Sequence, residues 1–281
     1  TTISRYFTKS RGKALSIGWF GLSTAEFILP VFIIYLLTFM EWRNIWINIS
    51  FAILLLPIIS YFLIKNIKLN SREIDNDKSK KNIKIKNWKR IEVIKDYRFY
   101  VVCANMLAMP WIGTGIFVYQ SFILSSKNWG SYVIAQSFMI YSILSVITLF
   151  IAGFLIDKFS SRKLLIYMNL PFLLSLFFIT VFDDPLVSFL FLGLIGISNG
   201  LANVLGSSIW AEVYGVKHIG SIKALTTALM VFSTAFGTAV FGLLIDKGFS
   251  IEEISIISGS YIFLSLIALF FVRNKLNPIK I

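Results

Sequence analysis

Histidine and cysteine are almost absent from this chain, which contains one of each, His218 and Cys103. A single cysteine cannot form an intrachain disulfide, and one His and one Cys far apart in the sequence do not make a metal site. Motifs of serine hydrolases, zinc proteases and phosphate-binding loops are also missing. The sequence therefore predicts no metal, no cofactor and no enzymatic activity.

Charged residues are scarce as well. They form 15% of the chain, whereas hydrophobic residues form 57%, and soluble domains carry about 25% charged residues. The net charge of +13 would suggest nucleic acid as a partner of a soluble protein. Here, however, the basic residues lie between apolar runs and do not alternate with exposed aromatic residues. The composition indicates a protein that is dissolved in a lipid bilayer and argues against nucleic-acid binding.

Long apolar runs recur along the whole chain. About 20 apolar residues in a helix span the roughly 30 Å hydrocarbon layer, and a helix satisfies its own backbone hydrogen bonds in lipid. The runs lack the period-2 alternation of a membrane barrel. We therefore expect an all-α membrane protein, a polytopic bundle with eight transmembrane helices at about 14–40, 45–64, 99–124, 131–156, 164–182, 186–211, 222–245 and 254–272.

Lysine and arginine occupy alternate loops between these runs. Of the 27 basic residues, 24 lie in one set of loops, and only Arg43, Lys127 and Lys247 lie in the other. Because cytoplasmic loops retain positive charge, we predict that both ends of the chain are cytoplasmic. The same distribution leaves no Lys or Arg deep inside a predicted helix.

One long hydrophilic stretch divides the chain. Residues 65–98 are rich in Lys, Asn, Asp and Ser, a composition typical of a solvated linker. Its basic run from Lys78 to Arg90 could alternatively bind anionic lipid headgroups. We predict two helices in 1–64, a basic cytoplasmic linker at 65–98 and a six-helix bundle at 99–281.

A distinctive motif follows the fourth predicted helix. It reads Gly153-Phe-Leu-Ile-Asp157-Lys158-Phe-Ser-Ser-Arg162-Lys163, and it resembles the Gly-x-x-x-Asp-(Arg/Lys)-x-Gly-x-(Arg/Lys)-(Arg/Lys) signature of the major facilitator superfamily, with Ser where the second Gly is usual. Its glycine lets helices approach, and its aspartate can pair at a helix end; the cations can pair with that aspartate or with a helix C-terminus. The resemblance implies a cytoplasmic gate, and a purely structural loop is the alternative.

Other segments resemble the same superfamily in the same order. They are Arg11-Gly12-Lys13-Ala14, Glu41-Trp42-Arg43, Ala211-Glu212-Val213-Tyr214-Gly215 and Gly220-Ser221-Ile222-Lys223-Ala224. With two helices, a linker and six further helices, this order implies the fifth to twelfth helices of a twelve-helix transporter. The chain begins with Thr1, and we expect it to be truncated at its N-terminus.

The segment Gly115-Ile-Phe-Val-Tyr119-Gln120 is similar to the Gly-x-x-Phe-His-Gln run in the seventh helix of bacterial transporters related to the monocarboxylate branch. Tyr119 stands where His is usual, so a proton relay is not carried over to this position. This resemblance implies a location in the plasma membrane, which in bacteria is the inner membrane.

Glu26 is a carboxylate near the middle of the first predicted helix. Placing an ionised group at mid-bilayer costs at least about 2.5 kcal/mol, so such residues are functional candidates. Small residues surround it, and Pro30 frees a backbone carbonyl nearby. We hypothesise that Glu26 carries a coupled proton or binds a polar group of the solute; a protonated structural Glu is the alternative.

Neutral polar residues also occur within or near the ends of the predicted helices. Gln120 and Asn203 are the stronger candidates for a solute cavity, because Gln120 neighbours Tyr119 and Asn203 lies one turn from Asn199. The alternative is an interhelical hydrogen bond, which contributes about 0.6 kcal/mol. The other residues of this kind are Asn105, Gln136 and Asn169.

Two further patterns concern helix packing. The segment Gly242-Leu-Leu-Ile-Asp246-Lys247 nearly repeats Gly153 to Lys158, and the charge pattern predicts that it lies on the opposite membrane face, as inverted repeats would. Pairs of small residues four apart, such as Gly196 and Gly200 or Ser233 and Gly237, predict close contact between helix backbones.

Together these features predict a secondary transporter that moves a small organic solute by alternating access within the lipid bilayer, with a proton as candidate coupling ion. A membrane-embedded enzyme is an alternative, but it would need a cluster of His, Asp or Glu near an interface. A non-transporting sensor on the same fold is another. An anionic solute would require a cation from outside the predicted helices, or helix N-termini.

Overall fold

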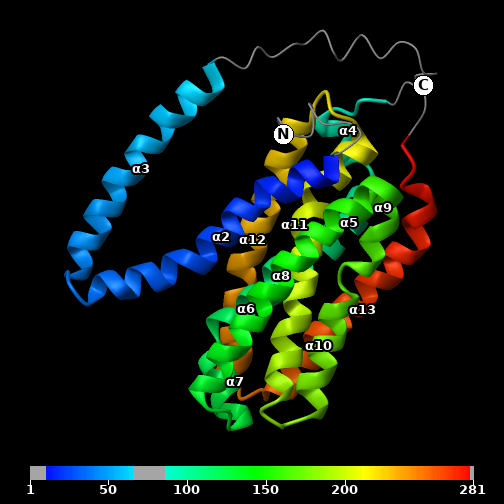
Figure 1. Cartoon of the computed structure of the whole chain (residues 1–281). Helices are drawn as coiled ribbons and strands as arrows, with labels where there is room; N and C mark the ends of the chain where they lie inside the picture. The colour runs from blue at the N-terminus through cyan, green and yellow to red at the C-terminus, as the bar shows by residue number, and fades with distance from the viewer. Residues whose placement is uncertain (1–10, 66–85, 279–281) are drawn as a thin grey trace. The chain divides into compact units, whose positions relative to one another are not determined.

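The computed structural model describes residues 11–65 and 86–278; within these ranges the side chains of residues 11, 22–31, 33, 34, 63–65, 131, 132 and 135 are not described. Nearly all of the described residues are helical, and they form no strand (Figure 1). The all-α fold class is confirmed. Contacts divide the chain into two compact units, Leu22–Lys84 and a larger unit of Thr1–Gly21 with Ile85–Ile281.

Seven helical segments in the described part of the chain are long and apolar enough to cross a membrane, as expected for an integral membrane protein. Each corresponds to one of the last seven predicted spans. The first predicted span, 14–40, coincides with α2 (Arg11–Leu37), whose central side chains lie outside the described residues. The seven segments are Trp42–Phe62, Tyr97–Val118, Gln136–Phe159, Ser161–Val181, Val187–Tyr214, Ile219–Asp246 and Ile251–Lys275.

The smaller unit contains the later part of α2 and α3 (Trp42–Lys65). A tight turn joins the two helices. Within it, the backbone N–H of Met40 donates to the carbonyl of Leu36 at 2.9 Å. The guanidinium of Arg43 lies 4.6 Å from the centre of the Trp42 ring. This unit is therefore two helices joined by a turn that carries an amphipathic Trp–Arg pair, a composition typical of a membrane interface.

The larger unit contains the first turns of α2 and every helix after α3 (Figure 1). Long helices run the length of the bundle, and short helices lie at its ends. The elements are α4 (Arg90–Ile94), α5 (Tyr97–Ala108), the π-helix η1 (Met109–Gly113), α6 (Thr114–Val118), α7 (Gln120–Lys127), α8 (Ser131–Phe159), α9 (Ser161–Leu164), η2 (Leu165–Tyr167), α10 (Leu170–Val181), α11 (Val187–Tyr214), α12 (Ile219–Asp246), α13 (Ile251–Val272) and η3 (Arg273–Lys275).

The predicted span at 99–124 is interrupted twice. Pro110, in η1, has no backbone N–H and cannot continue an α-helical ladder, so a π-helix forms there. Tyr119, with φ −100° and ψ 26°, then separates α6 from α7. These breaks divide one predicted span into α5, η1, α6 and α7.

Side chains from α12, from α13 and from the turn before α10 satisfy backbone carbonyls next to the first break. A break in the ladder leaves carbonyls without intrahelical partners, and an unpaired carbonyl is costly in lipid. The donors are Tyr261 Oη to the carbonyl of Ala104 at 2.8 Å, Asn169 Nδ2 to that of Asn105 at 2.6 Å, and Ser233 Oγ to that of Leu107 at 3.3 Å. The polar residue Asn169 thus acts as an interhelical hydrogen-bond donor.

The predicted close contact at Gly196 and Gly200 is confirmed. Both glycines face α8, where a Cβ on Gly196 would collide with the Tyr141 carbonyl oxygen and one on Gly200 would lie 2.5 Å from that of Ser145. Asn199, between them, donates from Nδ2 to Ser145 Oγ at 3.1 Å. Because lipid supplies no hydrophobic drive between helices, backbone proximity and such hydrogen bonds hold α8 against α11.

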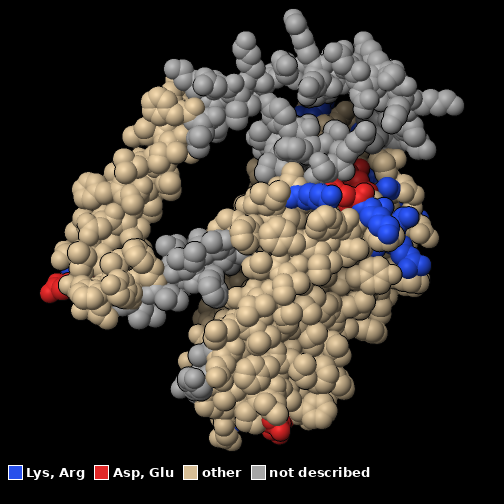
Figure 2. Space-filling model, in the orientation of Figure 1, with Lys and Arg blue, Asp and Glu red and all other residues tan. Residues whose placement is uncertain are grey.

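Apolar side chains are buried in two clusters along the larger unit. One surrounds Phe99, Met168 and Trp210, and the other surrounds Phe172 and Phe191. Polar networks lie beyond each cluster, at the two ends of the bundle. Figure 2 shows Lys, Arg, Asp and Glu gathered at one end and a small acidic patch at the opposite end, with other residues between them.

Candidate functional site

Asp157 connects α8 to the first turn of α2. Its Oδ1 accepts a hydrogen bond from the backbone N–H of Gly12 at 2.7 Å, and its Oδ2 accepts one from Lys13 at 3.1 Å. The first N–H groups of a helix have no partner within the helix, and they give its N-terminus a partial positive charge. A carboxylate at this place therefore gains both hydrogen bonds and charge attraction.

Gly153, one turn before Asp157, brings the backbones of α2 and α8 together. A Cβ at this position would collide with Ser16 Oγ and lie 3.0 Å from the Gly12 carbonyl oxygen. The Ser16 hydroxyl is buried and donates to the carbonyl of Leu149 at 2.8 Å. Two segments that matched superfamily motifs separately, 11–14 and 153–163, therefore form one contact in the structure.

Arg162 is paired with α11, not with Asp157. Its Nε donates to Glu212 Oε1 in a partly buried ion pair. The backbone N–H of Ser161 donates to the other oxygen of the same carboxylate at 2.8 Å. The Arg162 Nη1 also donates to the side-chain oxygen of Asn277. The loop between α8 and α10 is thereby fixed to the end of α11 and to the C-terminal segment.

The two lysines of the motif are exposed. Lys158 Nζ lies 5.3 Å from the centre of the Phe159 ring. Among the described residues, Lys163 has no acidic partner within ion-pair distance. The motif therefore divides into a tethering carboxylate, a tethering arginine and two surface cations.

The predicted solute-binding residues come from different helices. Tyr119 is half-buried, and its hydroxyl lies against Gly242 of α12. Gln120 begins α7, whereas Asn203 lies half-buried in α11. No hydrogen bond among the described side chains joins them. Glu26 lies in α2, but its side chain is outside the described residues. The roles of these four residues stay predictions.

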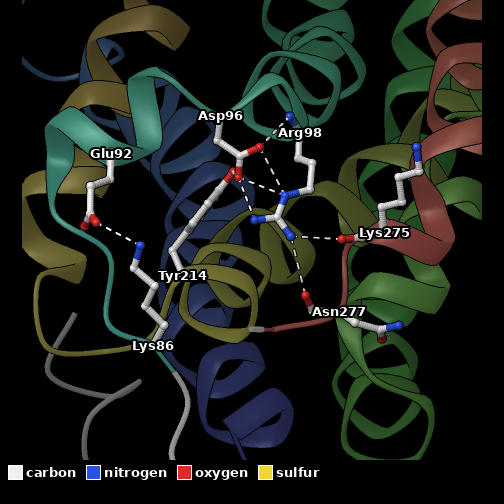
Figure 3. A network of polar contacts seen from close by, with 7 residues as sticks. All are labelled: Lys86, Glu92, Asp96, Arg98, Tyr214, Lys275 and Asn277. Atoms are coloured by element: carbon white, nitrogen blue, oxygen red, sulfur yellow. Dashed lines mark hydrogen bonds and ion pairs between the residues drawn. The ribbon is translucent and has the colours of Figure 1, made fainter. Parts of the chain in front are cut away.

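Arg98 forms a buried network that the charge pattern did not predict, since that pattern assigned Arg98 to the solvated linker. Its guanidinium donates to Asp96 Oδ2 at 2.8 Å and to the carbonyl of Lys275 at 2.9 Å. The hydroxyl of Tyr214 donates to the same carboxylate at 3.1 Å. Figure 3 shows these side chains converging from the start of α5, the end of α11 and the C-terminal segment. Only 7% of Arg98 is exposed.

One part of this network, the helix cap at Asp96, is recognisable from the sequence. Asp96 precedes the apolar run of α5, and its side chain accepts from the backbone N–H of Arg98, as an N-cap does. Asp at the start of an apolar helix is a recognisable cap. That the same carboxylate also receives a buried guanidinium depends on where α11 and α13 end.

The linker residues nearest the bundle belong to the same end. Trp88 donates its backbone N–H to the carbonyl of Tyr214 at 3.1 Å, and the two rings pack edge to face. Glu92 pairs with Lys86 at 2.8 Å (Figure 3). The hydrogen bond from Lys86, and then that from the Lys89 backbone, lowers the pKa of Glu92. The last residues of the predicted linker are thus anchored.

Lys127 holds the opposite end of the bundle together. Its buried ammonium lies 2.6 Å from Asp183, after α10, and 2.6 Å from Glu252, in the first turn of α13. Burial opposes the charged form, but the hydrogen bonds to Asp183 and Glu252 outweigh it and raise the pKa of Lys127. Trp129 Nε1 adds a hydrogen bond to the carbonyl of Asp183 at 2.7 Å.

A polytopic bundle of apolar helices, with charged networks at its ends and an interrupted helix within it, is the architecture of an integral membrane protein. Residues 100–280 match the family model of the Major Facilitator Superfamily. The chain therefore belongs to this superfamily of secondary transporters, integral membrane proteins that move small solutes across membranes. No curated protein matches the chain.

Proposed function

We propose that the protein moves a small organic solute across the bacterial inner membrane by alternating access, and that Asp157 closes one gate of the pathway. The observation that carries this proposal is the pair of hydrogen bonds from the backbone of Gly12 and Lys13 to its carboxylate. They join two helices that are distant in sequence without a covalent constraint.

The strength of this contact suits a gate. A carboxylate at a helix N-terminus contributes about 0.3–1 kcal/mol, and up to about 2 kcal/mol when partly buried. Two conformations that exchange during transport differ by only a few kcal/mol. One such contact can therefore shift the balance between open and closed states without locking the protein in either.

The distribution of charge supports a cytoplasmic position for this gate. Of the 27 basic residues, 24 belong to the set of loops that includes the segment after α8. Positive residues are retained on the cytoplasmic side during insertion. In this orientation the Asp157 contact closes the cytoplasmic end, and the Lys127 contact closes the external end.

The solute site is proposed to use neutral hydrogen-bonding groups. The buried cations Arg98 and Lys127 lie at the ends of the larger unit, and both are paired with carboxylates. Gln120 and Asn203 are the proposed contacts, with Tyr119 beside Gln120. The similarity of 115–120 to the monocarboxylate-related branch supports a small organic solute, and a carboxylate group could be received by a helix N-terminus.

Glu26 is proposed to carry the coupled proton. A carboxyl group in the middle of a membrane helix can change its protonation as the site faces one side or the other. If Glu26 has this role, net uptake of solute depends on it and exchange of solute does not. Net uptake driven by a proton gradient requires release of the proton on each cycle, whereas exchange of solute for solute does not.

Proteoliposomes test the proposal directly. Uptake of candidate organic solutes is measured with and without an inward proton gradient, together with solute counterflow. We expect Glu26→Gln to abolish the stimulation by the gradient and to retain counterflow. Asp157→Asn should slow both processes, and Asp246→Asn, which changes an exposed carboxylate, should slow neither. Unchanged gradient-driven uptake in Glu26→Gln would refute the proton role, and no transport of any solute would refute the transporter role.

A further inference from the structure

A cavity opens beside the gate motif, between the α9 loop and the end of α13. Its volume is about 640 Å³, which lies in the range of small-ligand pockets, roughly 300–1,000 Å³. Nothing in the transport cycle described above uses it. It is lined by Phe159, Arg162, Lys163, Leu164, Ile166, Tyr167, Leu269, Arg273, Asn274 and Asn277.

All the charged residues that line this cavity are cations. Three of its residues are cations, namely Arg162, Lys163 and Arg273, and none is acidic. Arg162 uses Nε for Glu212 and Nη1 for Asn277, and the described residues offer its Nη2 no partner. Arg273 stacks on the Phe270 ring at 4.0 Å, and neither it nor Lys163 has an acidic partner among the described residues. The amides of Asn274 and Asn277 add neutral hydrogen-bonding groups.

One wall of the cavity is held in place without a ligand. Leu276 is fully buried, and the guanidinium of Arg98 binds the carbonyl of Lys275 at 2.9 Å. Asn277 is fixed by Arg162 and donates from Nδ2 to the carbonyl of Asn274 at 3.0 Å. The C-terminal segment therefore presents Arg273 on a preorganised surface, which lowers the entropic cost of binding a ligand.

The rim of the cavity is apolar and faces outward from the bundle. Tyr167 and Phe159, in the lining, are 58% and 44% exposed. Exposed aromatic residues at the ends of membrane helices are typical of the headgroup level of a bilayer. An occupant would therefore meet cations on one side and hydrocarbon on the other.

We propose that this cavity binds the phosphate headgroup of an anionic phospholipid, with Lys163 and Arg273 as its main cationic contacts and Arg162 as a third. A phosphate supplies the negative charge and the acceptor oxygens that these donors require. The acyl chains then lie along the exposed apolar rim. Basic pockets between membrane helices recognise such headgroups by the same chemistry.

The proposal is tested on the purified, delipidated protein in a neutral detergent. Native mass spectrometry measures the affinity for phosphatidylglycerol and for phosphatidylcholine with the same acyl chains. We expect phosphatidylglycerol to bind more tightly. The double variant Lys163→Gln/Arg273→Gln should lose about 30-fold in phosphatidylglycerol affinity, the loss expected for two charges near a lipid surface. Arg273→Lys, which keeps the charge, should bind within a few-fold of the wild type.

The control variant is Lys217→Gln/Lys247→Gln, which removes the same number of charges from two exposed positions outside the cavity. It should leave the affinity unchanged. An equal loss in this control, or equal binding of the two lipids, would overturn the proposal. Glycerol 3-phosphate distinguishes a lipid from a free phosphate: weak competition supports a lipid site, whereas displacement at concentrations equal to those of the lipid would assign the cavity to a soluble phosphate.

Discussion

Two six-residue segments of this protein share a sequence pattern and differ in what they contact. Gly153 to Lys158 ends α8, and Gly242 to Lys247 ends α12. In the first, the glycine meets the backbone of α2 and the aspartate receives two N–H groups from it. In the second, the glycine meets only the phenol end of the Tyr119 side chain, and Asp246 is exposed.

The difference shows that the Gly-x-x-x-Asp-Lys pattern permits a contact with another helix but does not by itself produce one. An aspartate in the last turn of a helix is slightly unfavourable there, because the carbonyl end carries partial negative charge. Asp157 offsets this cost at the N-terminus of α2. Asp246 has no such partner among the described residues, so we infer that only the first segment acts as a tether.

The largest expected effect is that of Gly153→Ala. The added methyl group collides with Ser16 and approaches the Gly12 backbone, and overpacking of this kind costs about 1–3 kcal/mol. The variant should unfold at a lower temperature in detergent. Cys103, the single cysteine, is buried, so the rate at which a thiol-reactive dye labels it reports unfolding.

Gly242→Ala is the matched control for this change. Its methyl group meets the end of the Tyr119 side chain, which can rotate away. We expect a loss below about 1 kcal/mol, because the backbone need not move. Equal destabilisation by the two alanines would show that the segments are packed alike, contrary to the comparison.

The next largest effect is expected from Asp157→Asn. The amide keeps one acceptor but loses the charge at the helix N-terminus, so the free energy of unfolding should fall by about 1–2 kcal/mol. Asp246→Asn should change it by no more than about 0.5 kcal/mol, as for most surface substitutions. Dye labelling of Cys103 measures both, and a larger effect at Asp246 would reverse the assignment of the tether.

A smaller effect is expected from Lys127→Met, at the end of the bundle where the second segment lies. The ammonium is buried, but the Asp183 side chain is 81% exposed, so solvent screening limits the loss to roughly 0.5–1 kcal/mol. Lys247→Met should have no measurable effect. A cost at Lys247 equal to that at Lys127 would contradict the assignment of Lys127 as the contact that holds this end.

The stability difference between the wild type and Lys127→Met should depend on pH. The pKa of Lys127 is raised in the folded protein, so its stabilisation is fully present below the ordinary lysine pKa of about 10.4 and is lost as pH rises through the folded value. The difference between wild type and Lys127→Met should therefore be constant from neutral pH to about pH 9 and shrink in stronger alkali. Shrinkage between about pH 6 and pH 9 would exclude this ion pair as its source.

The smallest effect concerns the partner of Gly242. Tyr119→Phe removes the hydroxyl that the Gly242→Ala methyl group would meet. The double variant Tyr119→Phe/Gly242→Ala should therefore recover most of the small loss caused by Gly242→Ala alone. A double-mutant cycle on unfolding temperature measures this coupling, and additive effects would show that the methyl group is accommodated elsewhere.

The helices were predictable because lipid imposes a simple requirement. Each span must be long and apolar enough to cross the hydrocarbon layer, and the last seven predicted spans match those of the structure. The interruption at Pro110 was less apparent, since a proline in a membrane helix breaks the ladder only where neighbours such as Tyr261 can satisfy the freed carbonyls.

The candidate site was predictable in part. The motif residues from Gly153 to Lys163 were identified from their spacing, but their partners were not, because Gly12 and Glu212 are distant in the chain. Arg98 was assigned to a solvated linker from its surroundings in sequence. Its burial depends on Tyr214 and on the C-terminal segment, which approach it only in the folded bundle.

The sequence by itself determined the membrane class, the helix positions and the superfamily motifs, because each depends on residues that are close together in the chain. Only the tertiary structure decided that one Gly-x-x-x-Asp-Lys segment is tethered and the other is not, and that Arg162, Lys163 and Arg273 line a single cavity. The physical reason is that hydrogen bonds, ion pairs and steric exclusion act over a few ångströms. Which helix ends come within that distance is a property of the assembled bundle.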